Sequence, residues 1–233
     1  MGSFLGTLVL RLPHGRPILF ARSTCDSCGR TLSPLQLIPV LSWVVQRGSC
    51  SACGAKISLF YPAMEIAAAG IALWAGAVVS GVTLLLSLGL GWCLLALAVM
   101  DARTFRLSDA LTLPLIAGGI IAGWLLEPEH ILSHLIGAVT GWAGFLLLNL
   151  LYRTIRHRSG LGQGDAKLLA AGGAWLGWQG LGSVLLVASV AALLGVLVLQ
   201  VSGRKIDRQT PLAFGAFLCI GIWVVRLYGP IVS

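Results

Sequence analysis

Two aspartates of this sequence lie at the ends of long apolar segments. Asp101 follows the apolar run 92–100, and Asp165 lies in Gly160-Leu-Gly-Gln-Gly-Asp165-Ala-Lys167, which opens another apolar segment. Placing one ionised side chain in hydrocarbon costs about 2.5–3.5 kcal/mol on insertion scales, so such residues usually serve function. Two neighbouring carboxyl groups share a proton, so that one can activate water while the other donates to a carbonyl. This is the chemistry of an intramembrane aspartyl protease.

The residues alone leave a second interpretation open. Asp101 could be a helix-end residue paired with Arg103 or Arg106. Asp165 could be an N-cap or first-turn residue that the helix dipole favours. A lone G-x-G-D motif does not separate a catalytic pair from these structural roles.

Further polar and small residues could support such a pair. The glycines at 162 and 164 remove side chains beside Asp165, which would let a substrate backbone or a neighbouring helix approach closely. Asp109 suits the N-cap of the segment that follows it. Glu65 begins an apolar segment and could pair with a loop arginine or face the site. The candidates for support of the active site are Gly162, Gly164, Lys167, Asp109 and Glu65.

Four cysteines form two C-x-x-C pairs, Cys25-Asp-Ser-Cys28 and Cys50-Ser-Ala-Cys53, with 21 residues between the pairs. This is close to zinc-ribbon spacing, and four sulfurs suit tetrahedral zinc. A glycine follows each pair, where a turn around a metal needs open backbone angles. Two disulfides are the alternative, but a cytoplasmic location keeps thiols reduced. Four cysteine ligands leave no position for water, so we expect a structural zinc site.

The amino-acid composition indicates the kind of fold that holds these aspartates and cysteines in place. Of the 233 residues, 57% are hydrophobic and 10% charged, whereas a soluble domain is about 25% charged. The apolar runs are continuous rather than alternating, which favours helices over a β-barrel. We therefore expect an all-α, polytopic transmembrane helical bundle with a small cytoplasmic zinc-binding loop domain. The predicted spans are 63–80, 82–100, 110–126, 131–151, 166–178, 181–201 and 211–229.

The formal charge of +8 is distributed as an orientation signal rather than as one nucleic-acid-binding patch. Connections near 80–81, 127–130 and 178–180 carry no Lys or Arg, and the connections between them are basic. The basic residues are Arg103 and Arg106, then Arg153, Arg156 and Arg158, then Arg204, Lys205 and Arg208. The positive-inside rule places these loops and residues 11–61 in the cytoplasm, where anionic lipid headgroups are the natural partner. No nucleic-acid partner is expected.

Three domains are predicted along the chain. Residues 1–10 are apolar and are expected to form the inner end of a first transmembrane helix. Residues 11–62, rich in cysteine, proline and positive charge, are expected to form the cytoplasmic zinc-binding domain. Residues 63–233 are expected to form the helical protease domain in the membrane.

An ordered set of motifs resembles the bacterial type IV prepilin peptidases over nearly the whole chain. The N-terminal matches are Gly2-Ser-Phe-Leu5, Arg11-Leu-Pro13, Arg22-Ser-x-Cys25-x-x-Cys28, Ile38-Pro-Val-Leu-Ser-Trp43, Arg47-Gly-x-Cys50-x-x-Cys53 and Tyr61-Pro-x-x-Glu65. The later matches are Asp101 with Asp109 and Leu111-Thr-Leu-Pro114, then Gly162-x-Gly-Asp165-x-Lys167, then Phe214-Gly-x-Phe217. The chain departs from the family pattern at Gly6, Ser108 and Ala216, where Asn, Pro and Pro are usual.

The resemblance implies a concrete activity. Such an enzyme cleaves the leader of type IV prepilins or type II secretion pseudopilins after a glycine, at the cytoplasmic face of the bacterial inner membrane. Asp101 and Asp165 would be the catalytic pair. Many members also N-methylate the new terminus with S-adenosylmethionine, and the cysteine loop is associated with that activity. No glycine-rich nucleotide fingerprint is visible in the sequence.

Two other function classes remain possible from the residues. A proton-coupled transporter would use Asp101 and Asp165 as a relay, but transporters more often show internal repeats with broken helices at the midplane. A non-catalytic scaffold that binds a partner through the zinc loop would leave the G-x-G-D segment unexplained.

Overall fold

The computed structural model describes residues 2–12, 24–25, 27–33, 36, 38–156, 162–203 and 212–231. It divides into two compact units, Met1–Ala77 and Val78–Ser233. Most of the described residues are helical, and their only extended pairings are two isolated bridges in the cysteine segment. The expectation of an all-α fold is confirmed.

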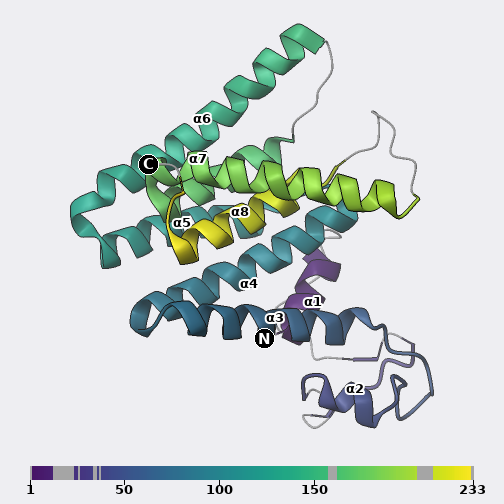
Figure 1. The fold of residues 1–233 in the computed structure, drawn as a ribbon. Helices are drawn as coiled ribbons and strands as arrows, with labels where there is room; N and C mark the ends of the chain where they lie inside the picture. The colour runs from purple at the N-terminus through teal and green to yellow at the C-terminus, as the bar shows by residue number, and fades with distance from the viewer. Residues whose placement is uncertain are drawn as a thin grey trace. The chain divides into compact units, whose positions relative to one another are not determined.

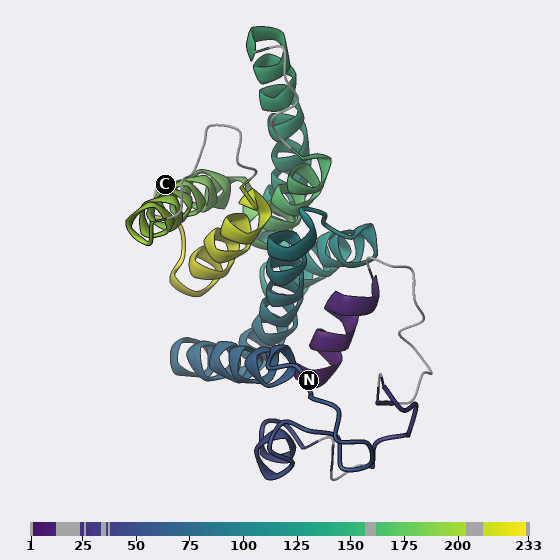
Figure 2. The same ribbon diagram turned by 90° about the vertical axis from the view of Figure 1, so that its right-hand side faces the viewer.

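The first unit contains α1 (Gly2–Arg11), the short α2 (Leu41–Val45) and most of α3 (Phe60–Val78). Helix α1 lies directly against the beginning of α3 (Figures 1 and 2). A Cβ at Gly2 would collide with the backbone of Glu65, and one at Gly6 would lie 3.3 Å from the Tyr61 ring. Both glycines therefore permit the close approach of the two helices.

The second unit holds the helices that follow α3 in the part of the chain that the structure describes. Its elements are α4 (Gly81–Thr104), α5 (Asp109–Leu126), η3 (Pro128–His130), α6 (Ile131–Arg156), α7 (Gln163–Val201) and α8 (Phe214–Tyr228). Helix α7 packs against α5, α6 and α8, and α8 also packs against α4. Both views show α8 beside the C-terminal part of α7 (Figures 1 and 2). The core of the unit is thus built around α7.

Five described helices are long and apolar enough to cross a membrane, and α8 is a shorter apolar helix of 15 residues. They cover the predicted spans, two of which lie within α7, and this confirms the polytopic membrane fold. Helix α4 runs to Thr104, so Asp101 lies within its last turn rather than after its end. Part of the predicted basic loops, including Arg158 and residues 204–208, falls outside the described residues.

Helix α7 is two helical segments that meet at Gly177. This residue has φ 72° and ψ 173°, which interrupt the helix. An unbroken helix from Gln163 to Val201 would be roughly 58 Å long, about twice the hydrocarbon thickness. The sequence predicted two spans separated near 179–180, and the structure places the break slightly earlier, at the glycine that can adopt a positive φ.

Glycines bring α6 and α7 into backbone contact. A Cβ on Gly137 would lie 2.5 Å from the carbonyl oxygen of Gly173, and one on Gly141 would lie 2.6 Å from that of Leu169. Such spacing of small residues is typical of closely packed membrane helices, where dispersion replaces the hydrophobic effect as the source of association. The position of α7, and with it Asp165, therefore depends on these two glycines of α6.

We predict that Gly137→Val destabilises the protein, while Gly144→Val on the same helix does not. A Cβ at Gly144 meets nothing within 4 Å, so the control adds the same side chain in open space. Overpacking at Gly137 should cost about 1–3 kcal/mol of unfolding free energy. Thermal unfolding in detergent measures the difference, and equal melting temperatures for the two variants would contradict the contact.

Candidate active site

Three helix ends bring the two predicted catalytic aspartates to one place. Asp101 lies in the last turn of α4, Asp165 in the first turn of α7, and Gly215 in the first turn of α8. A Cβ built on Gly215 would lie 2.9 Å from Oδ2 of Asp101 and 2.9 Å from Oδ1 of Asp165. The two carboxyl groups therefore face the same point, and the absence of a side chain at Gly215 leaves that point open.

The N-terminus of α8 supplies hydrogen-bond donors to this site. The backbone amide of Ala216 donates to Oδ2 of Asp101 at 3.0 Å, and the amide of Gly215 also interacts with this carboxylate. Asp101 is only 5% exposed, so these donors replace much of the water that it would otherwise bind. The positive end of the α8 dipole adds to the stabilisation of negative charge there.

Asp165 occupies a different but related environment. It is the third residue of α7, after the N-cap Gly162, and its carboxylate interacts with the backbone amide of Gly162. The Asp165 carboxyl is half-buried and is close enough to Asp101 for the two charges to interact. Asp165 therefore occupies the first turn of a helix, as expected if it only stabilised the helix dipole. It also faces a second carboxyl group, and a purely structural role would not require that.

An ion pair joins the helices beside the two aspartates. Nζ of Lys167 donates to both carboxylate oxygens of Asp109, at 2.6 and 2.7 Å. Ser108, rather than Asp109, is the N-cap of α5, so the predicted capping role of Asp109 is wrong. Its carboxylate instead ties α5 to the first turn of α7, where Lys167 lies two residues beyond Asp165. The Asp109 side chain is 58% exposed, so the pair contributes little stability by itself.

The other predicted support residues lie in two places. A Cβ on Gly162 would lie 3.3 Å from Oδ2 of Asp165, and one on Gly164 would lie 2.9 Å from Cβ of Leu107. Gly164 thus borders the connection between α4 and α5. Glu65 belongs to the first unit, where it accepts a hydrogen bond of 2.7 Å from the backbone amide of Val40.

The four cysteines of the C-x-x-C pairs form a cluster in the first unit that could hold a metal ion. Their sulfur atoms all lie within 4.8 Å of one another, and all six cysteines of the chain are free thiols. Sγ of Cys25 and Sγ of Cys53 are 3.9 Å apart, close to the roughly 3.8 Å that tetrahedral Zn–S bonds of about 2.3 Å produce. The donor set and its spacing therefore fit a metal ion of zinc type.

Two equivalent turns build this cluster. The amides of Gly29 and Gly54 donate to the carbonyls of Cys25 and Cys50, each at 2.9 Å. Both glycines have positive φ, 69° and 71°, which confirms the open backbone angles expected after each cysteine pair. Local sequence is therefore enough to shape each half of the site.

The thiols also affect one another. Backbone amides, that of Ala52 first and then that of Cys53, lower the pKa of Cys50 to about 6. At Cys53 the Ala55 amide acts in the same direction, but the neighbouring thiols, Cys28 first, and burial together outweigh it and raise the pKa to about 11. The first thiol of the cluster loses its proton readily. The last thiol resists deprotonation, because negative charge then accumulates in one place. A bound dication removes that repulsion.

The role of the α8 N-terminus was missed by sequence reasoning. In the sequence, Phe214-Gly-x-Phe217 is only a motif near the last predicted span. The glycine at its second position was the available signal, because glycine within the first turn of an apolar helix often marks a close approach. Asp101, which accepts the backbone amide of Ala216 in this turn, is 115 residues away from Ala216 in the sequence, a distance that no local pattern can indicate.

Both units of the chain match models of known protein families. Residues 1–79 match the bacterial Peptidase A24 N-terminal domain, and residues 88–198 match the type IV leader peptidase family. A prepilin leader peptidase/N-methyltransferase of Dickeya chrysanthemi is 38% identical over 217 residues, which cover 91% of this chain and 76% of that protein. The chain belongs to the type IV leader peptidase family.

Other relatives of the same name confirm this membership. The protein of Aeromonas hydrophila is 36% identical, covering 91% of this chain and 73% of the relative. The protein of Pseudomonas putida is 35% identical, covering 98% and 87%. No solved structure matches the chain. The family and its multi-pass helices indicate an inner-membrane protein, and the transporter hypothesis has no support among these findings.

We predict that Gly215→Ala lowers leader cleavage by roughly tenfold or more, equivalent to about 1.4 kcal/mol of activation free energy. The new methyl group would lie between the two carboxyl groups and displace either them or a reacting water. Ala216→Gly is the matched control, because it keeps the backbone amide and removes only one methyl group. Initial rates in detergent or membranes decide the matter, and full activity of Gly215→Ala would refute the placement of the site.

Proposed function

We propose that this protein removes the leader of type IV prepilins or type II secretion pseudopilins, cutting after a glycine at the cytoplasmic membrane face. Asp101 and Asp165 are the catalytic pair. The observation that carries the proposal is the convergence of both carboxyl groups on the point beside Gly215. Family membership supplies the class of substrate.

The proposed reaction uses one proton shared by the two carboxyl groups. The ionised carboxylate takes a proton from a water molecule, whose oxygen attacks the scissile carbonyl. The protonated carboxyl donates to the carbonyl oxygen, so that negative charge does not accumulate there. The carboxyl group that took the proton from water then gives it to the amine nitrogen as the C–N bond breaks. The other carboxylate takes back the proton of the former carbonyl oxygen, which restores the shared proton. The first-turn amides of α8 hold Asp101 in place throughout, because they contact its carboxylate directly.

Five residues are proposed to support this site, and the structural support differs from one to another: Gly162, Gly164, Lys167, Asp109 and Glu65. The ion pair of Lys167 and Asp109 ties α5 to α7 beside Asp165. The two glycines give room at Asp165 and at the connection after α4. For Glu65 the proposal rests on the sequence alone.

The orientation of the active site follows from the distribution of charge. Alternate connections carry Lys and Arg, and by the positive-inside rule this supports a cytoplasmic location for the ends of α4 and α7 that bear the aspartates. Residues 1–10 are proposed as the end of a first transmembrane helix, 11–62 as the cytoplasmic zinc domain and 63–233 as the protease domain. Substrate prepilins and membrane lipids are the proposed partners.

A second activity, N-methylation of the new N-terminus, is also proposed. The relatives carry N-methyltransferase in their names, and the N-terminal family match covers the cysteine cluster. S-adenosylmethionine is the proposed methyl donor. The metal proposed for the four cysteines is zinc, with a structural role, because four thiolates complete its coordination.

We expect Asp101→Asn and Asp165→Asn each to abolish leader removal while the protein still inserts into the membrane. An amide cannot take a proton from water, and it cannot share one with the remaining carboxyl group. The assay follows leader loss from a prepilin incubated with membranes that contain each variant. Glu129→Asn serves as a control, since Glu129 is exposed in η3. Complete processing by either aspartate variant would rule out the two-aspartate mechanism.

We expect Cys50→Ser to lower bound zinc, folding yield and methylation. Cys50 is the buried member of the cluster, and a metal site contributes directly to the folding of a small domain. Metal analysis of reduced, purified protein should find one zinc per chain in the parent and little in the variant. Cys93→Ser is the control, because Cys93 lies in α4 and takes no part in the cluster. Metal-free parent protein that remains folded and methylates its product would contradict this role.

A further inference from the structure

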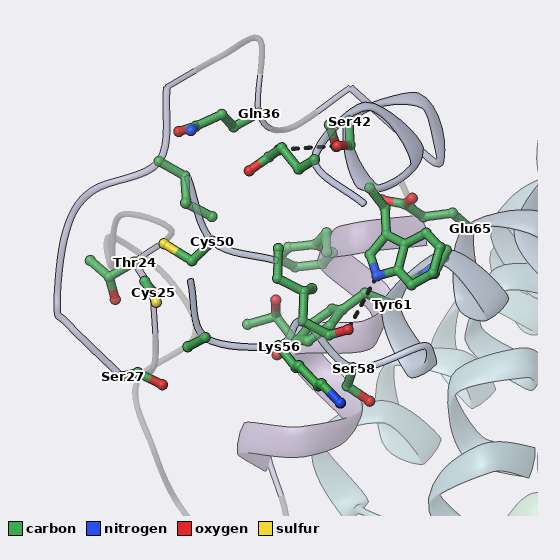
Figure 3. A pocket seen from close by; sticks show the side chains of 18 of the residues that line it. Thr24, Cys25, Ser27, Gln36, Ser42, Cys50, Lys56, Ser58, Tyr61 and Glu65 are labelled. Carbon is green, nitrogen blue, oxygen red and sulfur yellow. Dashed lines mark hydrogen bonds between the residues drawn. The ribbon is translucent and has the colours of Figure 1, made fainter. Parts of the chain in front are cut away.

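A cavity of about 470 Å³ lies in the first unit, between α1, the cysteine turns, α2 and the beginning of α3. All of its lining residues belong to this unit. Figure 3 shows Cys25 and Cys50 on one side of the cavity, and Tyr61 and Glu65 on the other. Its volume lies within the range of about 300–1,000 Å³ that is typical of small-molecule sites. The two aspartates of the second unit do not line it.

Aromatic rings form part of the wall and are held in place by their surroundings. The indole N–H of Trp43 donates to the carbonyl of Ile57 at 3.2 Å. A Cβ at Gly48 would lie 2.8 Å from this indole, so the ring fits closely over a glycine. Tyr61 packs edge-on against Phe60, with ring centroids 6.0 Å apart. Fixed aromatic faces of this kind stack on planar bases and attract cations.

Charges of both signs line the same cavity. Glu65 is the acidic residue among the lining residues, and Arg11 and Lys56 are the basic ones. Oε2 of Glu65 accepts the backbone amide of Val40, which orients the carboxylate. Val40 adopts φ 56°, which is rare for a β-branched residue and persists only where the surroundings enforce it. The cavity is thus prepared for a ligand that has both a cationic and an anionic group.

We propose that this cavity binds S-adenosylmethionine, with Glu65 facing the cationic part of the donor. The inference rests on the methyl transfer proposed above and assigns its site. Adenine can stack on the fixed aromatic rings, and the donor carboxylate can pair with Lys56 or Arg11. The sulfonium and ammonium groups carry the positive charge that a carboxylate among aromatic rings attracts.

The chemistry of the transfer is balanced without a further reagent. The new terminal amine of the cleaved substrate attacks the methyl carbon of the donor with its free electron pair. The carbon–sulfur bond breaks and its electrons stay on sulfur, which gives neutral S-adenosylhomocysteine. The methylated nitrogen then loses a proton to water.

The position of the cavity also accounts for a link between metal and methylation. Cys25 and Cys50 belong both to the cysteine cluster and to the cavity wall. A metal that fixes these turns would therefore also fix one side of the donor site.

The first experiment fills the cavity and leaves the rest of the unit unchanged. Ser42 lines the cavity from α2, whereas Val45, on the same short helix, is 72% exposed and does not line it. We expect Ser42→Phe in the full-length protein to weaken binding of labelled S-adenosylmethionine roughly tenfold or more. Methylation should fall in parallel, and leader cleavage should stay within about twofold of the parent. Val45→Phe, which introduces the same side chain, should match the parent in all three measurements.

The second experiment tests the charge of Glu65. Glu65→Gln keeps an oxygen that accepts the Val40 amide and removes the negative charge. We expect its affinity for S-adenosylmethionine to fall roughly tenfold, and that for S-adenosylhomocysteine, which lacks the sulfonium charge, to fall less. Equal losses for both ligands would contradict the proposed contact. Glu129→Gln, at an exposed position of η3, controls for a general effect of charge.

Two further measurements separate failure of the site from failure of the proposed function. Zinc content reports whether each variant is folded, because the cluster shares the cavity wall. Ultraviolet cross-linking of labelled donor to the parent should mark peptides within 41–65. Normal binding by zinc-replete Ser42→Phe, donor cross-linked only to 78–233, or no binding by the parent would overturn the site. A parent protein that leaves prepilin uncut would instead overturn the proposed peptidase function.

Discussion

A carboxylate buried among membrane helices has to find hydrogen-bond donors other than bulk water. The backbone of a continuous helix offers none, because its amides are already bonded within the helix. Free amides occur at helix N-termini, and here two such ends, those of α7 and α8, lie beside the carboxyl groups. This requirement explains why the candidate site lies where three helices end. It also explains why Gly215 carries no side chain, since a larger residue would separate the α8 amides from Asp101.

The rest of the second unit serves to hold those ends together. Helix α7 contacts α6 through Gly137 and Gly141, and α8 contacts α7 where a Cβ on Gly221 would lie 2.5 Å from the carbonyl of Val184. Arg226 of α8 donates to Ser87 of α4 at 3.3 Å and lies over the Trp175 ring of α7. These contacts fix α8 against both helices that bear an aspartate.

Sequence patterns predicted the local features of this protein well and its long-range contacts poorly. The helices follow from continuous apolar segments, and the cysteine turns follow from a spacing that acts within five residues. Asp101 and Asp165 could be selected because charge in an apolar segment is costly. The α8 amides could not be selected from the sequence, because their contact with Asp101 depends on packing across the whole unit. The sequence also could not show that the Asp109 carboxylate pairs with Lys167, a residue of another helix, since α5 begins at Asp109 with Ser108 as its N-cap.

The break at Gly177 has a consequence for how the protein enters its membrane. From Gln163 to Gly177 the first segment of α7 is roughly 20 Å long, shorter than a hydrocarbon core of about 30 Å. Most of its side chains from Ala166 to Trp175 are buried against neighbouring helices rather than turned toward lipid. Such a segment is a weak membrane anchor during synthesis. Its integration has to be cooperative with that of α6 and the later helices, so that the segment bearing Asp165 settles only when its protein surroundings are already present.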